Sequence, residues 1–167
     1  MGRAPSPSLT IRPAAEADLP LIFALIHELA EYERASPGDV SITESQLREA
    51  LFAPSRLVEV LLAFLDGEIA GYAMFLHNFS SWRGRRGVYL EDLFVRPPTR
   101  RSGVGRSLLR EVARIAVERN CARIEWRVLT WNQPAIDFYR SLGAAPLDEW
   151  TTFRITGTAL ERLADSK

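Results

Sequence analysis

A short glycine-containing segment places the strongest constraint on how this chain can fold. This glycine segment, Arg100–Arg106 (RRSGVGR), follows the apolar run Val88–Val95 and leads into a helical pattern over Leu108–Arg119. Another apolar run, Arg123–Leu129, comes after that helix. Two strands of one sheet that are joined through a helix run parallel. The sequence therefore predicts a strand–helix–strand crossover with the glycine segment at its first corner.

The glycine segment is suited to bind an anion. Its two glycines lack a Cβ and let the backbone approach a ligand, and the first turn of the helix leaves N–H groups without partners. The helix dipole and the arginine side chains also favour a phosphate group. The candidate residues are Arg100, Arg101, Ser102, Gly103, Val104, Gly105 and Arg106.

Two common nucleotide signatures do not fit the glycine segment. It has no Gly-Lys-Ser/Thr for a Walker loop, and it lacks the third glycine of a dinucleotide-binding fingerprint. What remains is the spacing Arg100-x-x-Gly103-x-Gly105. By itself this spacing also fits a glycine-containing helix start with solvated arginines.

Composition predicts one globular domain. The chain has 167 residues, of which 47% are hydrophobic and 25% charged, so a substantial core is expected over residues 9–167, after a disordered tail over residues 1–8. Lys+Arg and Asp+Glu balance at 21 each, which gives no reason to expect nucleic acid or a membrane as a partner. No apolar run is long enough to span a membrane.

Cysteine and histidine are too few for a disulfide framework or a metal site. The chain contains one cysteine, Cys121, and two histidines, His27 and His77. We therefore expect no metal and a reducing, cytoplasmic location. Cys121 precedes an apolar run and is expected to be buried filler rather than a nucleophile.

The remaining pattern predicts further helices and strands. Asp66-Gly67 is typical of a type I′ turn between two antiparallel strands. We predict strands over Leu9–Arg12, Val58–Leu65, Ile69–Phe79 and Leu147–Ile155. We predict a helix over Leu19–Glu33, with Asp18 before it, and a helix over Pro134–Ser141, with Gly143 after it. Two capping boxes predict further helices: Thr43 with Gln46 begins one that ends at Leu51, and Thr158 with Glu161 begins a short terminal one.

Four further segments, together with the glycine segment, resemble the GNAT superfamily of N-acetyltransferases. They are Arg12–Ala14, Glu28–Glu33 (ELAEYE), Tyr89–Val95 (YLEDLFV) and Trp131–Tyr139 (WNQPAIDFY). They are similar to the spermidine/spermine (diamine) and thialysine acetyltransferase branch. The resemblance covers nearly the whole chain. It implies an α/β (α+β mixed) fold: a twisted, mostly antiparallel sheet of six to seven strands flanked by four to five helices.

The resemblance also implies an activity. It is the direct transfer of an acetyl group from acetyl-CoA to a primary amine of a small diamine, polyamine or thialysine-like amino acid. Such an amine, with a pKa of about 10.4, is neutral about once in 2,500 at pH 7, so its proton must be accepted. Glu91 matches the residue with that role in the branch, where a β-bulge splays the sheet. A solvated Glu91 beside a bridging Asp92 is the structural alternative.

Other matches give the expected contacts with the acetyl donor. The backbone N–H groups of Leu93 and Val95 would hold the pantetheine arm and the thioester, and Asn132 would also contact the donor. Tyr139 would give a proton to the departing sulfur. From pattern alone, Asn132 is equally an ordinary helix cap and Tyr139 a core aromatic.

Four residues match the amine site of the branch: Tyr32, Glu33, Trp82 and Asp92. Aromatic faces and carboxylates suit a second ammonium group, although Glu33 is equally a solvated glutamate. The loop of residues 80–87 carries three arginines, Arg83, Arg85 and Arg86, which favours a smaller diamine or amino acid over a long polyamine.

Other functions stay open at this stage. One is a noncatalytic acyl-CoA-binding sensor, and another is a GNAT enzyme that acts on a protein or antibiotic amine. Nucleic-acid binding through the arginine-rich loop ranks last and would be steeply salt-dependent. The resemblance also implies a homodimer, for which the C-terminal strands would be a natural pairing site.

Overall fold

The computed structural model describes residues 7–166. Contacts divide the chain into two compact units: the first ends at Arg127 and the second begins at Val128. The first contains every strand, and the second contains the last two helices. The single domain over residues 9–167 stays a prediction. The predicted tail falls mostly outside the described residues, and Ser8 forms two hydrogen bonds of 2.8 Å with Asp66.

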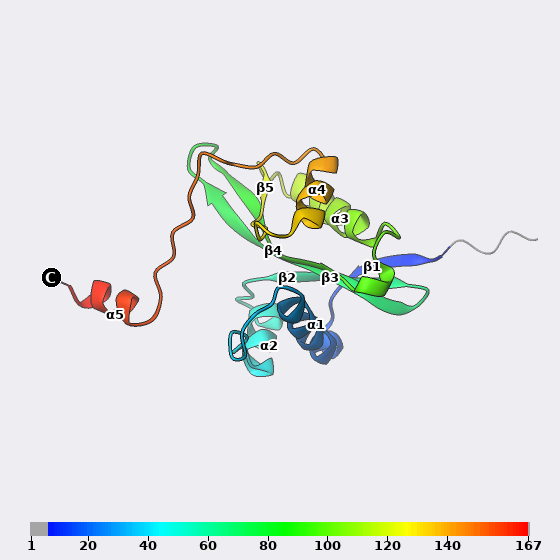
Figure 1. Ribbon diagram of the computed structural model, residues 1–167, viewed down its shortest axis with the longest axis horizontal. Helices are drawn as coiled ribbons and strands as arrows, with labels where there is room; N and C mark the ends of the chain where they lie inside the picture. The colour runs from blue at the N-terminus through cyan, green and yellow to red at the C-terminus, as the bar shows by residue number, and fades with distance from the viewer. Residues whose placement is uncertain (1–6, 167) are drawn as a thin grey trace, which may run out of the picture. The chain divides into compact units, whose positions relative to one another are not determined.

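The first unit is built on a five-stranded sheet (Figure 1). Neighbouring strands are antiparallel from β1 to β4, and β5 is parallel to β4. This confirms the mixed sheet and the parallel crossover, but not the count of six to seven strands. The strands are β1 Leu9–Pro13, β2 Glu59–Leu65, β3 Glu68–Ser80, β4 Arg85–Val95 and β5 Ile124–Glu125.

Helices cover both faces of this sheet. In Figure 1, α1 and α2 lie on one face and α3 on the other. Two short 3₁₀ segments, η1 and η2, lie before α1 and α3. The bounds are η1 Glu16–Asp18, α1 Leu19–Tyr32, α2 Glu44–Phe52, η2 Pro97–Thr99 and α3 Val104–Glu118.

Strand β2 shows how the two faces are filled. Val60 and Leu62 belong to the core shared with α1 and α2, whereas Leu61 and Ala63 alternate with them and point to the α3 side. All four are buried. Burying a Val or Leu side chain contributes about 1.5–3 kcal/mol, so a strand buried on both faces anchors the sheet.

Local sequence determines several element ends. The Thr43–Gln46 capping box is confirmed, because the Thr43 side chain accepts from Gln46 N and Gln46 Oε1 accepts from Thr43 N. Asp18 does precede α1, but its carboxylate binds the Arg12 guanidinium and Ala15 N instead of capping the helix. Positive φ angles of 52° and 85° at Asp66 and Gly67 agree with the predicted turn between β2 and β3.

The second unit contains α4 Gln133–Ser141 and α5 Gly157–Asp165. Gly143, with φ 87°, follows α4 as predicted. The predicted strand over Leu147–Ile155 is wrong for the described chain, because no neighbouring strand pairs with this exposed segment, which begins with a turn. The capping box at Thr158 is also wrong: α5 begins at Gly157, and its cap position Thr156 makes no side-chain capping bond. None of the described helices is both long and apolar enough to cross a membrane.

Candidate active site

A β-bulge at Glu91 changes the direction of side chains along β4. In the β3–β4 ladder, Met74 pairs with Asp92 and Phe75 with Leu90, which leaves Glu91 as the extra residue. Directly paired residues share a face of the sheet. Met74 belongs to the core with α1 and α2, so Asp92 lies on that face and Leu90 on the other. The bulge predicted at this position is confirmed.

Beyond the bulge, β4 has an open edge. Strand β5 pairs with β4 only at Val88 and Tyr89, so within residues 7–166 no β5 residue pairs with the end of β4. Arg96, which directly follows β4, donates its backbone N–H to Ala70 O on β3 at 2.8 Å. Since antiparallel hydrogen bonds alternate, the N–H groups of Leu93 and Val95 point away from β3. They therefore face the open edge.

The glycine segment leaves backbone donors without helical acceptors at the start of α3. Gly103 occupies the cap position with φ 86°, and no side chain caps the helix. The first helical bond is from Ser107 N to Gly103 O, at 3.0 Å. The N–H groups of Val104, Gly105 and Arg106 precede that bond and have no acceptor within the helix. A Cβ added to Gly103 would meet nothing within 4 Å, so there is room beside these donors.

Within the glycine segment, side chains divide between internal contacts and solvent. Ser102 Oγ donates to Thr99 O, and the Val104 side chain is buried. Arg101 has a φ of 67°, an uncommon value for a residue other than glycine. The side chains of Arg101 and Arg106 are exposed, and they add positive charge near the free N–H groups.

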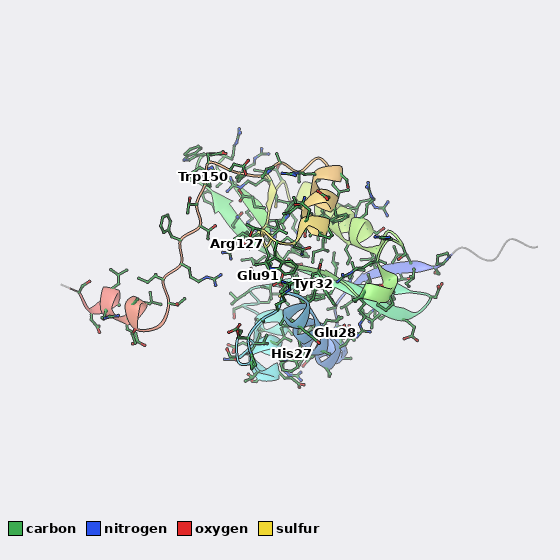
Figure 2. The ribbon with its side chains drawn as sticks, in the orientation of Figure 1. His27, Glu28, Tyr32, Glu91, Arg127 and Trp150 are labelled. Atoms are coloured by element: carbon green, nitrogen blue, oxygen red, sulfur yellow. The ribbon has the colours of Figure 1, made fainter. Side chains whose placement is uncertain are left out.

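Arg100 joins the glycine segment to α1. Its guanidinium carbon lies 4.3 Å from the centre of the Tyr32 ring, and its Nε donates to Val95 O at 3.0 Å. In Figure 2, Tyr32 lies where α1 approaches β4, and its ring centre is 6.4 Å from that of Phe94. A predicted donor-binding residue and a predicted amine-binding residue are therefore in contact.

Three carboxylates come together between α1 and β4; we call Glu33, Glu91 and Asp92 the acidic group. Asp92 Oδ2 accepts a hydrogen bond of 2.9 Å from the hydroxyl of Tyr72. Burial raises the pKa of Asp92 to about 6; the charges of Glu91 and Glu33 act in the same direction, and the Tyr72 bond acts against them. Desolvation also raises the pKa of Glu33, although that residue as a whole is exposed.

This combination of a bulge, an open strand edge and free donors at a helix start agrees with the sequence resemblance. The model of the "Acetyltransferase (GNAT) family" matches residues 23–144, which is more than half of the chain. The chain belongs to the GNAT family. It is an amine N-acetyltransferase, and enzymes of this family take the acetyl group from acetyl-CoA.

Relatives of this GNAT enzyme cover nearly all of it. A thialysine N-epsilon-acetyltransferase from Bos taurus is 38% identical over 92% of this chain and 96% of its own length. An L-ornithine N5-acetyltransferase from Arabidopsis thaliana is 34% identical over 92% of this chain and 86% of its own. A solved integron cassette protein from the V. cholerae mobile metagenome is 29% identical, with a TM-score of 0.77 over 95% of this chain and 99% of its own. These matches confirm the predicted fold class and branch.

Trp82 lies apart from the acidic group. It is in the turn between β3 and β4 and is 88% exposed. Asp92 lies seven positions after Arg85, the first residue of β4, a distance of roughly 20 Å along a strand. Within this unit the structure brings Tyr32, Glu33, Glu91 and Asp92 together, but not Trp82.

Asn132 and Tyr139 belong to the second unit of the GNAT enzyme. Asn132 is the cap of α4, and its Oδ1 accepts from Ala135 N at 3.4 Å. The helix-cap interpretation of Asn132 is thus confirmed, and a cap does not exclude a further contact. Tyr139 lies on α4 with its ring centre 5.3 Å from that of Phe138. The two residues are seven apart, about two helical turns, so both lie on one side of α4.

Sequence reasoning missed two interactions near this site. Tyr72 is fully buried, and no local pattern indicates that its hydroxyl reaches Asp92. Arg96 binds Glu28 through two hydrogen bonds, Nε to Oε2 at 2.9 Å and Nη2 to Oε1 at 2.5 Å, and so connects the end of β4 to α1. Both depend on strand register and on the position of α1, which are properties of the folded chain.

A cavity of about 360 Å³ lies elsewhere in the first unit, among α2, β2 and α3. Its lining includes Glu59 and Arg119, whose Nη2 donates to Glu59 Oε2 at 2.8 Å. None of the predicted site residues lines it. The cavity is therefore separate from the open edge of β4.

Proposed function

We propose that this GNAT enzyme acetylates a primary amine of a small diamine or of a basic amino acid such as thialysine or ornithine. The observation that carries the proposal is the position of the acidic group beside the open edge of β4. A second ammonium on the substrate would be attracted to Glu33 and Asp92, the two carboxylates of the acidic group that do not take part in the reaction. The names of the two enzyme relatives, a thialysine and an L-ornithine acetyltransferase, support this substrate class.

The glycine segment fits the diphosphate of acetyl-CoA. The free N–H groups of Val104, Gly105 and Arg106 are suited to phosphate oxygens, and the arginine side chains add charge. The outward N–H groups of Leu93 and Val95 would bind the pantetheine arm and the thioester carbonyl. Asn132 would contact the donor from α4. Acetyl-CoA, when bound, supplies the thioester whose acetyl group is transferred.

Glu91 is the proposed proton acceptor. At pH 7 about 4.6 kcal/mol is needed to neutralise an amine with a pKa near 10.4, and a carboxylate at the bulge can take that proton directly or through a water. Glu91 is exposed and next to the outward N–H groups of β4, so it can reach a ligand at this edge. Tyr139 would then give a proton to the sulfur. No covalent enzyme intermediate is required.

The proposed amine-binding residues are chosen because carboxylates and an aromatic face attract a positively charged ammonium group. Tyr32, Glu33 and Asp92 would hold the second ammonium of the substrate. Trp82, at the distant hairpin turn, would contribute only if a second copy of the chain supplied it. This is the one predicted residue whose role depends on assembly.

We also propose that the enzyme is a cytoplasmic homodimer. The support comes from the second unit, which exposes Trp150 (65%) and Phe153 (91%) on a segment without a paired strand. Exposed aromatic residues of this kind are typical of a surface covered by a partner. Sedimentation equilibrium tests the oligomeric state, and a monomer at micromolar concentration would contradict it.

The test of function is a substrate screen. Purified enzyme, acetyl-CoA and a panel of amines are mixed with a thiol reagent, and products are identified by mass spectrometry. The panel contains thialysine, ornithine, lysine, putrescine, spermidine, an aminoglycoside and a lysine peptide. We expect the amino acids and short diamines to give the highest kcat/KM. Thiol release that never exceeds the rate without amine would support an acyl-CoA sensor instead.

A further inference from the structure

We propose that Tyr72 is a positioning residue for Asp92, and that this buried pair determines the preference for amines with a second positive charge. The inference rests on the proposed function and extends it to a residue outside the motifs of the family resemblance. Tyr72 would not touch the reacting atoms. It would act through the carboxylate that it holds.

The position of Tyr72 is set by the core. Its side chain is fully buried, and its ring centre is 6.4 Å from that of Phe94, with the planes tilted by 60°. Tyr72 pairs with Phe94 across β3 and β4, while Met74 pairs with Asp92, so Tyr72 and Asp92 are diagonal neighbours on one face. A ring packed in this way cannot follow Asp92 if the carboxylate moves. The hydroxyl is therefore a stationary donor.

The hydrogen bond holds one side of the Asp92 carboxylate. Tyr72 OH donates to Oδ2 at 2.9 Å, so an ammonium can approach through Oδ1. A hydrogen bond to an ionised acceptor is about twice as strong as one between neutral groups. Without the phenol, a desolvated carboxylate would lose a donor that water replaces poorly at a buried position.

Charge around the pair favours a cation. The groups that act on Asp92 are Tyr72 on β3, Glu91 on β4 and Glu33 after α1, and both glutamates are acidic. A cation from the glycine segment, Arg100, lies over the ring of Tyr32 on α1. Burial and the two glutamates raise the pKa of Asp92 to about 6, and the Tyr72 bond lowers it. Removing the hydroxyl should raise that pKa further and leave less carboxylate ionised at pH 7.

A purely structural role for Tyr72 makes a different prediction. If the residue only fills the core, its replacement by Phe affects all amines equally. If it holds Asp92 for a second ammonium, the replacement weakens diamines selectively. The comparison therefore needs two substrates that differ only in that ammonium.

The experiment compares 1,5-diaminopentane with n-pentylamine in the full-length enzyme. Wild type, Tyr72→Phe, Asp92→Asn and the double variant are assayed from pH 5.5 to 9. Tyr89→Phe is the matched control, because its phenol oxygen accepts from Arg127 Nε at 2.7 Å on the same sheet but outside the acidic group. Thermal unfolding establishes that each variant is folded at the assay temperature.

We expect Tyr72→Phe to raise the KM for the diamine about tenfold at pH 7, with kcat and the pentylamine KM within about twofold of wild type. The acid limb of kcat/KM for the diamine should move to higher pH. The double variant should match Asp92→Asn, since the two side chains act as one unit. Tyr89→Phe should keep the wild-type ratio between the two amines.

An unchanged diamine-to-monoamine ratio in Tyr72→Phe, or an equal loss with both amines, would overturn the inference. Calorimetric binding of both amines to the wild type and Tyr72→Phe separates this result from a failure of the proposed function. If no amine is acetylated, the proposed function fails. A diamine preference in binding that Tyr72→Phe abolishes would still support the positioning role, and no such preference would overturn it.

Discussion

The glycine segment and the acidic group are built in different ways. The glycine segment offers backbone N–H groups from consecutive residues at the start of α3, and Gly103 occupies the cap position before them. The acidic group consists of side chains from the end of α1 and from β4, supported by Tyr72 of β3. A backbone site suits acetyl-CoA, which is the same whichever amine is acetylated, whereas the side chains of an amine site can differ between enzymes with different amines. The enzyme thus separates the common substrate from the variable one.

The largest effect is expected at Glu91, the member of the acidic group at the bulge of β4. Glu91→Gln keeps the size of the side chain but cannot accept a proton. We predict a fall in kcat of about 100-fold to 1,000-fold at pH 7. Partial recovery is expected at pH 9 to 10, where more of the amine is already neutral. The measurement is a pH–rate profile with saturating acetyl-CoA, and a wild-type profile would reject the role of Glu91.

The next prediction concerns the cost of the acidic group to stability. Burial raises the pKa of Asp92 to about 6 from a usual value of 3.8, so between these pH values the folded state holds a proton that the unfolded chain has released. The resulting penalty is absent below pH 3.8, grows as pH rises from 3.8 to about 6, and is fully present above 6. Asp92→Asn should remove this penalty and stabilise the fold by roughly 2–3 kcal/mol at pH 7.

Urea unfolding at pH 4.5 and pH 7 measures this difference. We expect the variant to gain about three times as much stability over wild type at pH 7 as at pH 4.5, while its activity on diamines falls. A variant that is destabilised equally at both values would show that Asp92 is a structural residue.

The third prediction breaks the backbone site alone. Gly103→Ala forces a side chain into a left-handed conformation, which costs about 1–2 kcal/mol. We expect the Kd for coenzyme A to rise about tenfold, with the KM for the amine little changed. Gly67→Ala is the control: its φ of 85° gives the same strain, and neither glycine has an atom within 4 Å of an added Cβ. Equal effects of both variants on coenzyme A affinity would contradict a backbone site at Gly103.

The smallest effect is expected at the connection between the end of β4 and α1. Arg96→Met removes the two hydrogen bonds to Glu28, and since both side chains are about one-third exposed, the loss should be only about 0.5–1 kcal/mol. The KM for the amine should rise slightly, because α1 carries Tyr32. Arg114→Met, which removes the ion pairs with Glu111 and Glu118 on α3, should leave the amine KM unchanged. A larger effect of Arg114→Met on amine KM would reject this connection.

The two regions also differ in how far they could be predicted from sequence. The glycine segment was visible because its residues are consecutive and the helix start after it follows from local pattern. The bulge at Glu91 came from the family resemblance, and the Tyr72–Asp92 bond from neither source, since it depends on β3–β4 register.

The prediction of an extra strand over Leu147–Ile155 is wrong for a similar reason. Its apolar residues fit a strand, but a strand needs a paired neighbour, and none exists within the described chain. Local pattern gives the propensity of a segment and cannot supply its partner. The parallel strand predicted over Arg123–Leu129 is also shorter than expected, because only Ile124 and Glu125 of β5 pair with β4.

The central claim is that backbone N–H groups of β4 and α3 hold the acetyl donor. Titration of ¹⁵N-labelled enzyme with coenzyme A tests it directly by NMR. The largest shifts should fall on the amides of Leu93, Val95, Val104, Gly105 and Arg106, and an added diamine should leave those of the α3 start unchanged. Coenzyme A binding that leaves these five amides unmoved while others shift would contradict the account.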